Sequence, residues 1–244
     1  MKSVRLEIEY DGTGFKGWAK QPGQRTVQGE LEAALATVLR EQVELTVAGR
    51  TDTGVHAKEQ VASFDSGMAV PTDLARRLNG LCPADVKVTA VTPAPDGFDA
   101  RADARSRTYR YRILTRSSSS PFEEDRALWW PHRMDRDALE ACAALLMGKH
   151  DFTAFTPTQT DHVHFNRKIF SAAWSRDGDI VSFQVTADAF MRSMVRVLVG
   201  TQLEVASGRR TLDSFKQLLR GAPRDQAGET APPHGLYLES VSYD

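Results

Sequence analysis

The stretch VELTVAGRTDTGVHAKEQVASF, residues 43–64, gives the clearest indication of the fold class. Its hydrophobic pattern predicts an apolar strand over residues 43–48, a loop over 49–57 and a second strand over 60–64. This connection is too short for a helical crossover, and strands joined in this way pair antiparallel. The sequence therefore predicts an α+β fold and not a doubly wound parallel sheet.

Hydrophobic periodicity predicts the other elements. The alternation from Val4 to Tyr10 is typical of a half-buried strand, and Thr26 has the position of an N-cap for a helix that ends near Arg40. Further strands are expected over residues 86–91, 107–114, 168–175, 180–187 and 236–243, and further helices over 71–81, 136–147, 190–205 and 212–219. The serine run at 117–120 is the best linker candidate, so we expect two halves, residues 1–116 and 117–244.

Composition excludes several classes of protein. The 244 residues are 41% hydrophobic and 26% charged, with a formal net charge of -1, which is ordinary for a globular protein. No stretch has the roughly 18 apolar residues of a membrane span, and the N-terminus lacks the apolar core of a signal peptide. The two cysteines, Cys82 and Cys142, do not form a C-x-x-C motif, so we expect a cytoplasmic protein without disulfides. The balanced charge by itself gives no indication of a nucleic-acid partner.

Two cofactor motifs are tested and set aside. GTGFKG at residues 12–17 matches G-x-G-x-x-G after a predicted strand, which would suggest a nicotinamide dinucleotide. The following residues include Pro22 and Gly23, which break the helix that such a site requires, so a glycine-rich turn is favoured. His162 and His164 share one face of an extended segment, but no third metal ligand lies at a familiar spacing.

Asp52 is the first candidate for catalysis. It lies between Gly49 and Gly54, two residues after Arg50, at the end of an apolar strand. Loops at strand ends commonly carry catalytic groups, and flanking glycines let a bulky partner approach. The alternative is an aspartate that binds its own backbone in a turn, which is the commoner fate of Asp beside Gly.

Residues 101–116 form a strongly basic segment, with six arginines and a single acidic residue, while acidic residues gather elsewhere, as at 123–125. Within it, RTYRYR at 107–112 places Tyr109 and Tyr111 on one face of a strand and Arg110 and Arg112 on the other. Arginine binds phosphate and an aromatic face stacks on an unpaired base, so the pattern indicates a nucleic-acid surface. The alternative is a solvated arginine face over two core tyrosines.

The third candidate segment is FMRSMVRVLVG at residues 190–200, which predicts an apolar helix. Arg192 and Arg196 are four positions apart and would share one face of that helix. An arginine among apolar residues requires a carboxylate or phosphate partner, because burying it unpaired is costly. The alternative is a pair of surface arginines on an amphipathic helix.

These segments occur together in a recognisable order. The motifs are YDGT at 10–13 with GW at 17–18, GRTDTGVHA at 49–57, RTYRYR at 107–112, FMRSMVRVLVG at 190–200 and GLYL at 235–238. In this order they resemble the TruA family of tRNA pseudouridine synthases, from about Lys2 to Tyr243. The resemblance implies a pseudouridine synthase fold of two similar halves, whose largely antiparallel sheets join around a central basic cleft with helices on the outer faces.

The same resemblance implies the activity and the residues that carry it. It implies a homodimer that isomerises uridine to pseudouridine at nucleotides 38, 39 and 40 of the tRNA anticodon stem-loop, without a metal or organic cofactor. Asp52 would be the catalytic aspartate, Arg196 would pair with it, and Tyr109 would stack on the target base. The implied substrate-binding residues are Arg50, Tyr109, Leu236, Arg101 and Arg107.

Three positions depart from the family pattern. Asp99 stands where many relatives have histidine, Ser193 where a larger polar residue is frequent, and Ala19 where glutamine is frequent. None of them is a predicted catalytic residue, so they bear on RNA contact and on the choice of tRNA position. Two rival functions remain: a non-catalytic tRNA-binding module, and a nucleotide-cofactor oxidoreductase acting through residues 12–17.

Overall fold

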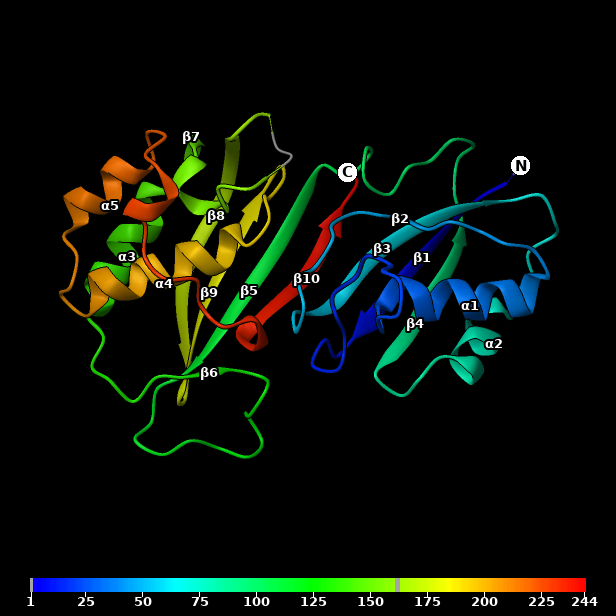
Figure 1. The fold of residues 1–244 in the computed structure, drawn as a ribbon, viewed down its shortest axis with the longest axis horizontal. Coiled ribbons are helices and arrows are strands. Elements are labelled where there is room, and N and C mark those ends of the chain that lie inside the picture. The colour runs from blue at the N-terminus through cyan, green and yellow to red at the C-terminus, as the bar shows by residue number, and fades with distance from the viewer. Residues whose placement is uncertain (1, 161–162) are drawn as a thin grey trace. The chain divides into compact units, whose positions relative to one another are not determined.

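The structure, a computed structural model, describes residues 2–160 and 163–244. The chain divides into two compact units (Figure 1). The first consists of Met1–Arg105 together with Tyr237–Asp244, and the second of Ser106–Leu236.

The sheet of the first unit is mostly antiparallel. Its elements are β1 (Lys2–Tyr10), α1 (Val27–Leu39), β2 (Thr46–Val47), β3 (His56–Ser66), α2 (Leu74–Leu81), β4 (Val86–Pro93) and most of β10 (Leu236–Ser242). The strand order is β4-β1-β3-β10, with β1 antiparallel to both neighbours and β10 parallel to β3. The short strand β2 pairs with β3, and α1 and α2 pack against each other, with α2 against β4 (Figure 1).

The second unit repeats this architecture with an antiparallel sheet of order β5-β9-β8-β7. Its strands are β5 (Ser106–Leu114), β6 (Leu128–Trp129), β7 (Gly148–Asp151), β8 (Asn166–Asp177) and β9 (Ile180–Ala187). Its helices are α3 (Arg136–Leu145), α4 (Met194–Ala206) and α5 (Leu212–Leu218), with short 3-10 turns at Thr153–Phe155, Arg224–Gln226 and Pro233–Gly235. Helix α3 packs on β8 and α4 on β5, which confirms the α+β class.

The compact units do not follow the expected boundary between residues 116 and 117. Strand β5 pairs with β9 over eight residues, which places residues 106–114 in the second unit. Tyr237 and Leu238 pair with β3, so the last strand returns to the first unit. The serine run lies inside the second unit and is not the link between the units. These pairings join residues far apart in sequence, which a local composition signal does not reveal.

Helix α1 begins where the sequence predicts. The Thr26 hydroxyl accepts a hydrogen bond from the Gly29 backbone N–H at 3.3 Å, and Arg40 ends the helix in the left-handed region with φ 58°. Val27, Leu31 and Leu35 are fully buried on the face toward the core.

Three predicted elements differ in their bounds. The expected strand over 43–48 is reduced to β2, Thr46–Val47, whereas β3 starts earlier than expected, at His56. The helix expected from residue 190 begins at Met194, because Ser193 takes a left-handed conformation with φ 58° that an α-helix does not continue through.

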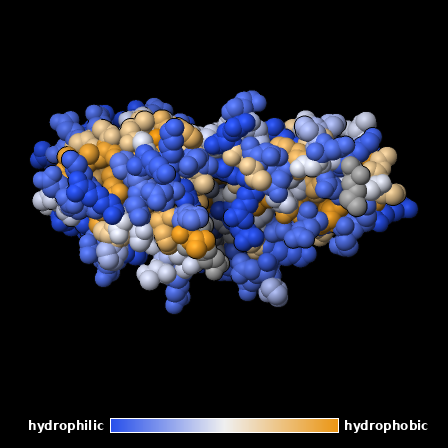
Figure 2. All heavy atoms as spheres, turned by 90° about the horizontal axis from the view of Figure 1, so that it is seen from above, coloured by the Kyte–Doolittle hydropathy of each residue, from blue (hydrophilic) through white to orange (hydrophobic). Residues whose placement is uncertain are grey.

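In the described part of the chain, no helix is long and apolar enough to cross a membrane. The face drawn in Figure 2 is mostly hydrophilic, with smaller hydrophobic areas between the polar side chains. Large exposed hydrophobic side chains are found at Met68, Leu81, Phe122, Trp129, Met147, Val163, Phe170 and Leu212.

Candidate active site

Asp52 lies in the loop between β2 and β3 of the first unit. The loop turns tightly, since the Val55 backbone N–H donates to the Asp52 carbonyl oxygen at 3.1 Å and Gly54 has φ 77°. The Trp18 N–H donates to the Thr51 carbonyl oxygen, also at 3.1 Å. Asp52 is half-buried. A carboxylate is therefore held on a short loop with its backbone fixed on both sides.

Two glycines of the GTGFKG motif let a second loop lie directly on this one. A Cβ at Gly12 would lie 2.0 Å from the Val55 carbonyl oxygen, and a Cβ at Gly17, which has φ 89°, would lie 2.8 Å from that of Thr51. The next helix begins only at Val27. The glycines thus let the two backbone segments lie close together. As the sequence predicts, they are not followed directly by the helix that a dinucleotide site requires.

A buried polar cluster supports the loop from below. The hydroxyls of Tyr10 and Thr51 share a hydrogen bond of 2.8 Å, and the Gln60 amide donates to the Gly49 carbonyl oxygen at 2.8 Å. Burial raises the pKa of Tyr10 to about 12, although its hydrogen bonds with Thr51 and Gln60 oppose that shift. Tyr10 and Thr51 belong to the sequence motifs, but no motif indicates that their hydroxyls bind each other. Gln60 lies outside the motifs, and sequence reasoning missed it.

In the second unit, β5 shows the predicted alternation. Tyr109 and Tyr111 are buried, whereas Arg110 is half-exposed and donates to the Gln184 side chain at 3.1 Å. The edge of Tyr109 meets the ring of Phe190 with centroids 5.0 Å apart. The Tyr111 hydroxyl donates to the Pro232 carbonyl oxygen at 2.8 Å, and burial raises its pKa against the opposing effect of the Arg196 charge.

Two arginines of the basic strand are engaged within the second unit. Arg107 is 8% exposed and lies on the tyrosine face, where its Nη1 donates to the Asp188 carbonyl oxygen at 2.8 Å. Arg112 forms an ion pair with Glu123 at 2.9 Å. The sequence predicts that the acidic run at 123–125 lies away from the basic strand. The ion pair shows that this is wrong for Glu123, which neutralises part of the charge of the strand.

Arg101 belongs to the first unit and is exposed. The neighbouring Asp99 carboxylate accepts hydrogen bonds from the backbone N–H groups of Arg101 and Ala102, at 2.7 and 2.8 Å. Asp99 thus stabilises the local turn, and its charge is directed to the backbone.

Arg196 lies on α4 and is half-buried among apolar neighbours. Its Nε donates to the Ala231 carbonyl oxygen at 2.8 Å, and the Ala231 N–H donates to the Arg196 carbonyl oxygen at 3.1 Å. The expectation that Arg192 shares a helix face with Arg196 is wrong, because Arg192 precedes the helix. Its Nη2 donates to the Gln159 carbonyl oxygen instead.

The predicted site residues are divided between the two units. Arg50, Asp52 and Arg101 lie in the first unit, where Arg50 is exposed two residues from the half-buried Asp52. The second unit carries the others: Arg107, Tyr109, Arg196 and the buried Leu236, which is its last residue.

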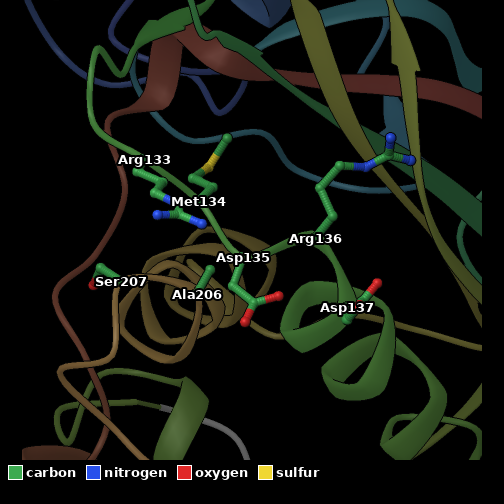
Figure 3. Close-up of a pocket in the computed structure, with 7 residues that line it drawn as sticks. All are labelled: Arg133, Met134, Asp135, Arg136, Asp137, Ala206 and Ser207. Carbon is green, nitrogen blue, oxygen red and sulfur yellow. The ribbon is translucent and has the colours of Figure 1, made fainter.

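The described residues contain no group of three or more His, Cys, Asp or Glu side chains that could hold a metal ion. Of the two histidines considered above as metal ligands, His162 lies outside the described residues. An open hollow of about 530 Å³ in the second unit involves none of the predicted site residues (Figure 3). It is lined by Arg133, Met134, Asp135, Arg136, Asp137, Ala206 and Ser207.

Comparison with known proteins identifies the class. A family described as tRNA pseudouridine synthase matches residues 7–102 and 142–244. The tRNA pseudouridine synthase A of Bacillus pumilus (strain SAFR-032) is 41% identical over 244 residues, covering 99% of each chain. That of Frankia casuarinae is 46% identical over 243 residues, covering 98% of this chain and 89% of the relative. That of Streptomyces griseus is 43% identical over 249 residues, covering 98% and 87%.

The fold and these likenesses define an RNA-modifying isomerase. The chain belongs to the TruA family of tRNA pseudouridine synthases.

Proposed function

We propose that this enzyme isomerises uridine to pseudouridine at positions 38, 39 and 40 of the tRNA anticodon stem-loop, with Asp52 as the catalytic aspartate. The observation that carries the proposal is the Asp52 loop. A half-buried carboxylate sits on a tight turn, and the backbone on both sides of it is held by Gly12, Gly17 and Trp18. A carboxylate held in this way is preorganised for chemistry on a base.

The reaction suits a carboxylate without a redox partner. The N1–C1′ bond of uridine breaks, the uracil rotates, and a C5–C1′ bond forms, while C5 loses a proton and N1 gains one. Electrons balance, so the step calls for no oxidant or reductant. An ionised Asp52 either attacks as a nucleophile or removes a proton from the sugar. Enclosing the detached uracil prevents its loss to water.

Arg196 is proposed to pair with Asp52. An opposite charge near a carboxylate favours its ionised form. The Nε of Arg196 donates to the Ala231 carbonyl oxygen, and this hydrogen bond orients the guanidinium. A preoriented arginine gives up less conformational freedom when it binds a carboxylate.

Tyr109 is proposed to stack on the target base after that base leaves its helical stack. Unstacking costs a few kcal/mol, which arginine–phosphate contacts offset. Arg50 and Arg101 are exposed and suited to such contacts. Arg107 contributes less because it is 8% exposed, and Leu236 would form an apolar wall against the uracil.

The proposal is tested by mapping pseudouridine in bulk tRNA from cells that lack this protein and from cells in which it is restored. We expect pseudouridine at positions 38–40 to disappear and to return with the wild-type gene. Unchanged modification in the deletion strain would contradict the assigned positions. Purified protein that binds tRNA but forms no product would favour the binding-module alternative. We also propose that the enzyme is a homodimer in the cytoplasm.

A further inference from the structure

His56 lies where three of the sequence motifs meet in the first unit. It is the first residue of β3, four residues after Asp52, and it is 2% exposed. Its ring contacts Gly12 of the YDGT motif and Tyr237 of the GLYL motif. The proposed chemistry assigns no role to this buried, titratable side chain.

The hydrogen bond to Gly12 engages Nδ1 of the His56 ring. The Gly12 backbone N–H donates to Nδ1 at 3.0 Å, and a backbone N–H only donates, so Nδ1 is the acceptor of this hydrogen bond. The Asp11 Oδ1 atom lies 3.2 Å from the same Nδ1, and it also accepts from the backbone N–H and the hydroxyl of Thr13.

The ring orientation of His56 is fixed by stacking. Its centroid lies 4.6 Å from that of Tyr237, with 24° between the planes, and the two residues are register partners of β3 and β10. A stacked ring cannot tilt away from Gly12 without losing this contact, so Nδ1 stays directed at the Gly12 N–H.

Gly12 in turn lies against the loop that carries Asp52. A Cβ there would be 2.0 Å from the Val55 carbonyl oxygen, and the Val55 N–H binds the Asp52 carbonyl oxygen at 3.1 Å. Any shift of Gly12 therefore displaces the backbone turn that carries Asp52. In an interior packed without voids such a shift is transmitted to the neighbouring group.

We propose that His56 is a positioning residue for the isomerisation: its Nδ1 holds the Gly12 turn on the Asp52 loop and so sets the place of the Asp52 carboxylate. This inference rests on the proposed role of Asp52. A displacement of about 1 Å in a catalytic group lowers a rate by up to ~100-fold, so the effect should be large and confined to the chemical step.

The test separates the hydrogen bond from the ring stack by comparing two substitutions. His56→Asn keeps an acceptor near the position of Nδ1 and removes the ring, whereas His56→Phe keeps the ring and removes the acceptor. We expect kcat for release of tritium from tRNA labelled at uridine C5 to fall at least ~10-fold in the Phe variant and to stay within ~3-fold of wild type in the Asn variant. The tRNA dissociation constant should change less than ~2-fold in both, since neither group is assigned to RNA contact.

Val61→Ala is the matched control, because Val61 is fully buried in the same strand and the substitution keeps its backbone, whose carbonyl oxygen accepts from the Ala48 N–H at 2.9 Å. It should lower the melting temperature while leaving kcat at the wild-type level. If His56→Phe does not fold, His56→Gln is measured instead. The side-chain oxygen of glutamine lies near the position of Nε2, so this variant also lacks an acceptor at the position of Nδ1.

The inference is overturned if His56→Phe, or His56→Gln in its place, keeps kcat within ~2-fold of wild type. It is also overturned if His56→Asn is no more active than that variant. Asp52→Asn is measured beside them. Full activity in Asp52→Asn would remove the proposed role of Asp52. An inactive Asp52→Asn beside an unaffected His56→Phe would remove only the role of His56.

Discussion

Tyr10 shows how a single residue without a chemical role supports the candidate site. Tyr10 is buried, and its hydroxyl shares a hydrogen bond of 2.8 Å with the hydroxyl of Thr51, one residue before Asp52. The same hydroxyl receives a hydrogen bond from the Gln60 amide at 3.3 Å. Burial raises the pKa of Tyr10 to about 12, so the phenol stays protonated in the native state when an exposed tyrosine would ionise.

Tyr10→Phe should therefore have a pH-dependent effect on stability. At pH 7 we expect a loss of about 1–2 kcal/mol in the free energy of unfolding, because the Thr51 hydroxyl loses its buried partner. Above pH 10 the unfolded tyrosine ionises and the native one does not until about pH 12, so the wild type loses stability as pH rises. Tyr10→Phe does not lose stability in this way. The difference in unfolding free energy between the wild type and the variant should therefore narrow by roughly 0.8 kcal/mol between pH 9 and 10.5.

Urea unfolding of both proteins at pH 7, 9 and 10.5 measures this gap, with the pH 7 difference as the internal reference. A gap that stays constant or widens with pH would show that the Tyr10 hydroxyl ionises at an ordinary pKa.

At the scale of elements, helix α4 holds the segment that leads into β10. Gly200 lets the backbone of this segment approach, since a Cβ there would lie 1.9 Å from the Glu229 carbonyl oxygen. The Gly228 N–H donates to the Thr201 hydroxyl at 3.0 Å, and Ala231 exchanges two hydrogen bonds with Arg196. The helix thus orients the guanidinium of Arg196 and anchors residues 228–231 together.

Gly200→Ala should disturb both functions of α4. The new methyl group must displace the Glu229 backbone, which should cost about 1–3 kcal/mol of stability. Release of the Arg196–Ala231 contact should also lower kcat by ~10-fold or more. Urea unfolding and tritium release from labelled tRNA measure the two effects separately.

Gly80→Ala in helix α2 is the matched control, because no heavy atom lies within 4 Å of the added Cβ. It should raise stability by up to ~1 kcal/mol and leave activity unchanged. If Gly200→Ala behaved like this control, the close approach of Glu229 would have no energetic consequence.

The sequence predicts elements well where the signal is local. The Thr26 cap, the alternation of Tyr109 and Tyr111 and the turn that carries Asp52 all follow from neighbouring residues. The start of α4 was misplaced because Ser193 adopts a left-handed conformation that no short-range pattern indicates. Other supports of the loop, such as Tyr10 on β1, lie far from it in sequence, and only the folded chain brings them together.

At the scale of the whole molecule, the formal charge of -1 conceals how the charges are arranged. Several acidic residues lie in ion pairs with arginine, such as Asp85 with Arg25 at 2.8 Å and Glu123 with Arg112 at 2.9 Å. A balanced total is compatible with binding a polyanion, provided that some arginines are exposed to solvent. Arg101 is one of the exposed arginines.

The division of the chain into units shows the limit of sequence reasoning at this scale. Composition placed a boundary at the serine run, but the strand pairings of β5 and β10 decide where each segment belongs. The proposed catalytic aspartate, Asp52, lies in the first unit, and its proposed arginine partner, Arg196, lies in the second. A functional measurement tests this pairing.

The most direct test of the central claim is tritium release from tRNA labelled at uridine C5 by the Asp52→Asn enzyme under single-turnover conditions. Asp96→Asn serves as the control, since it makes the same change at an exposed carboxylate of the first unit. We predict that Asp52→Asn binds tRNA with an affinity within ~3-fold of wild type but releases no tritium above background, while Asp96→Asn reacts at the wild-type rate. Release of tritium by Asp52→Asn at the wild-type rate would contradict the account.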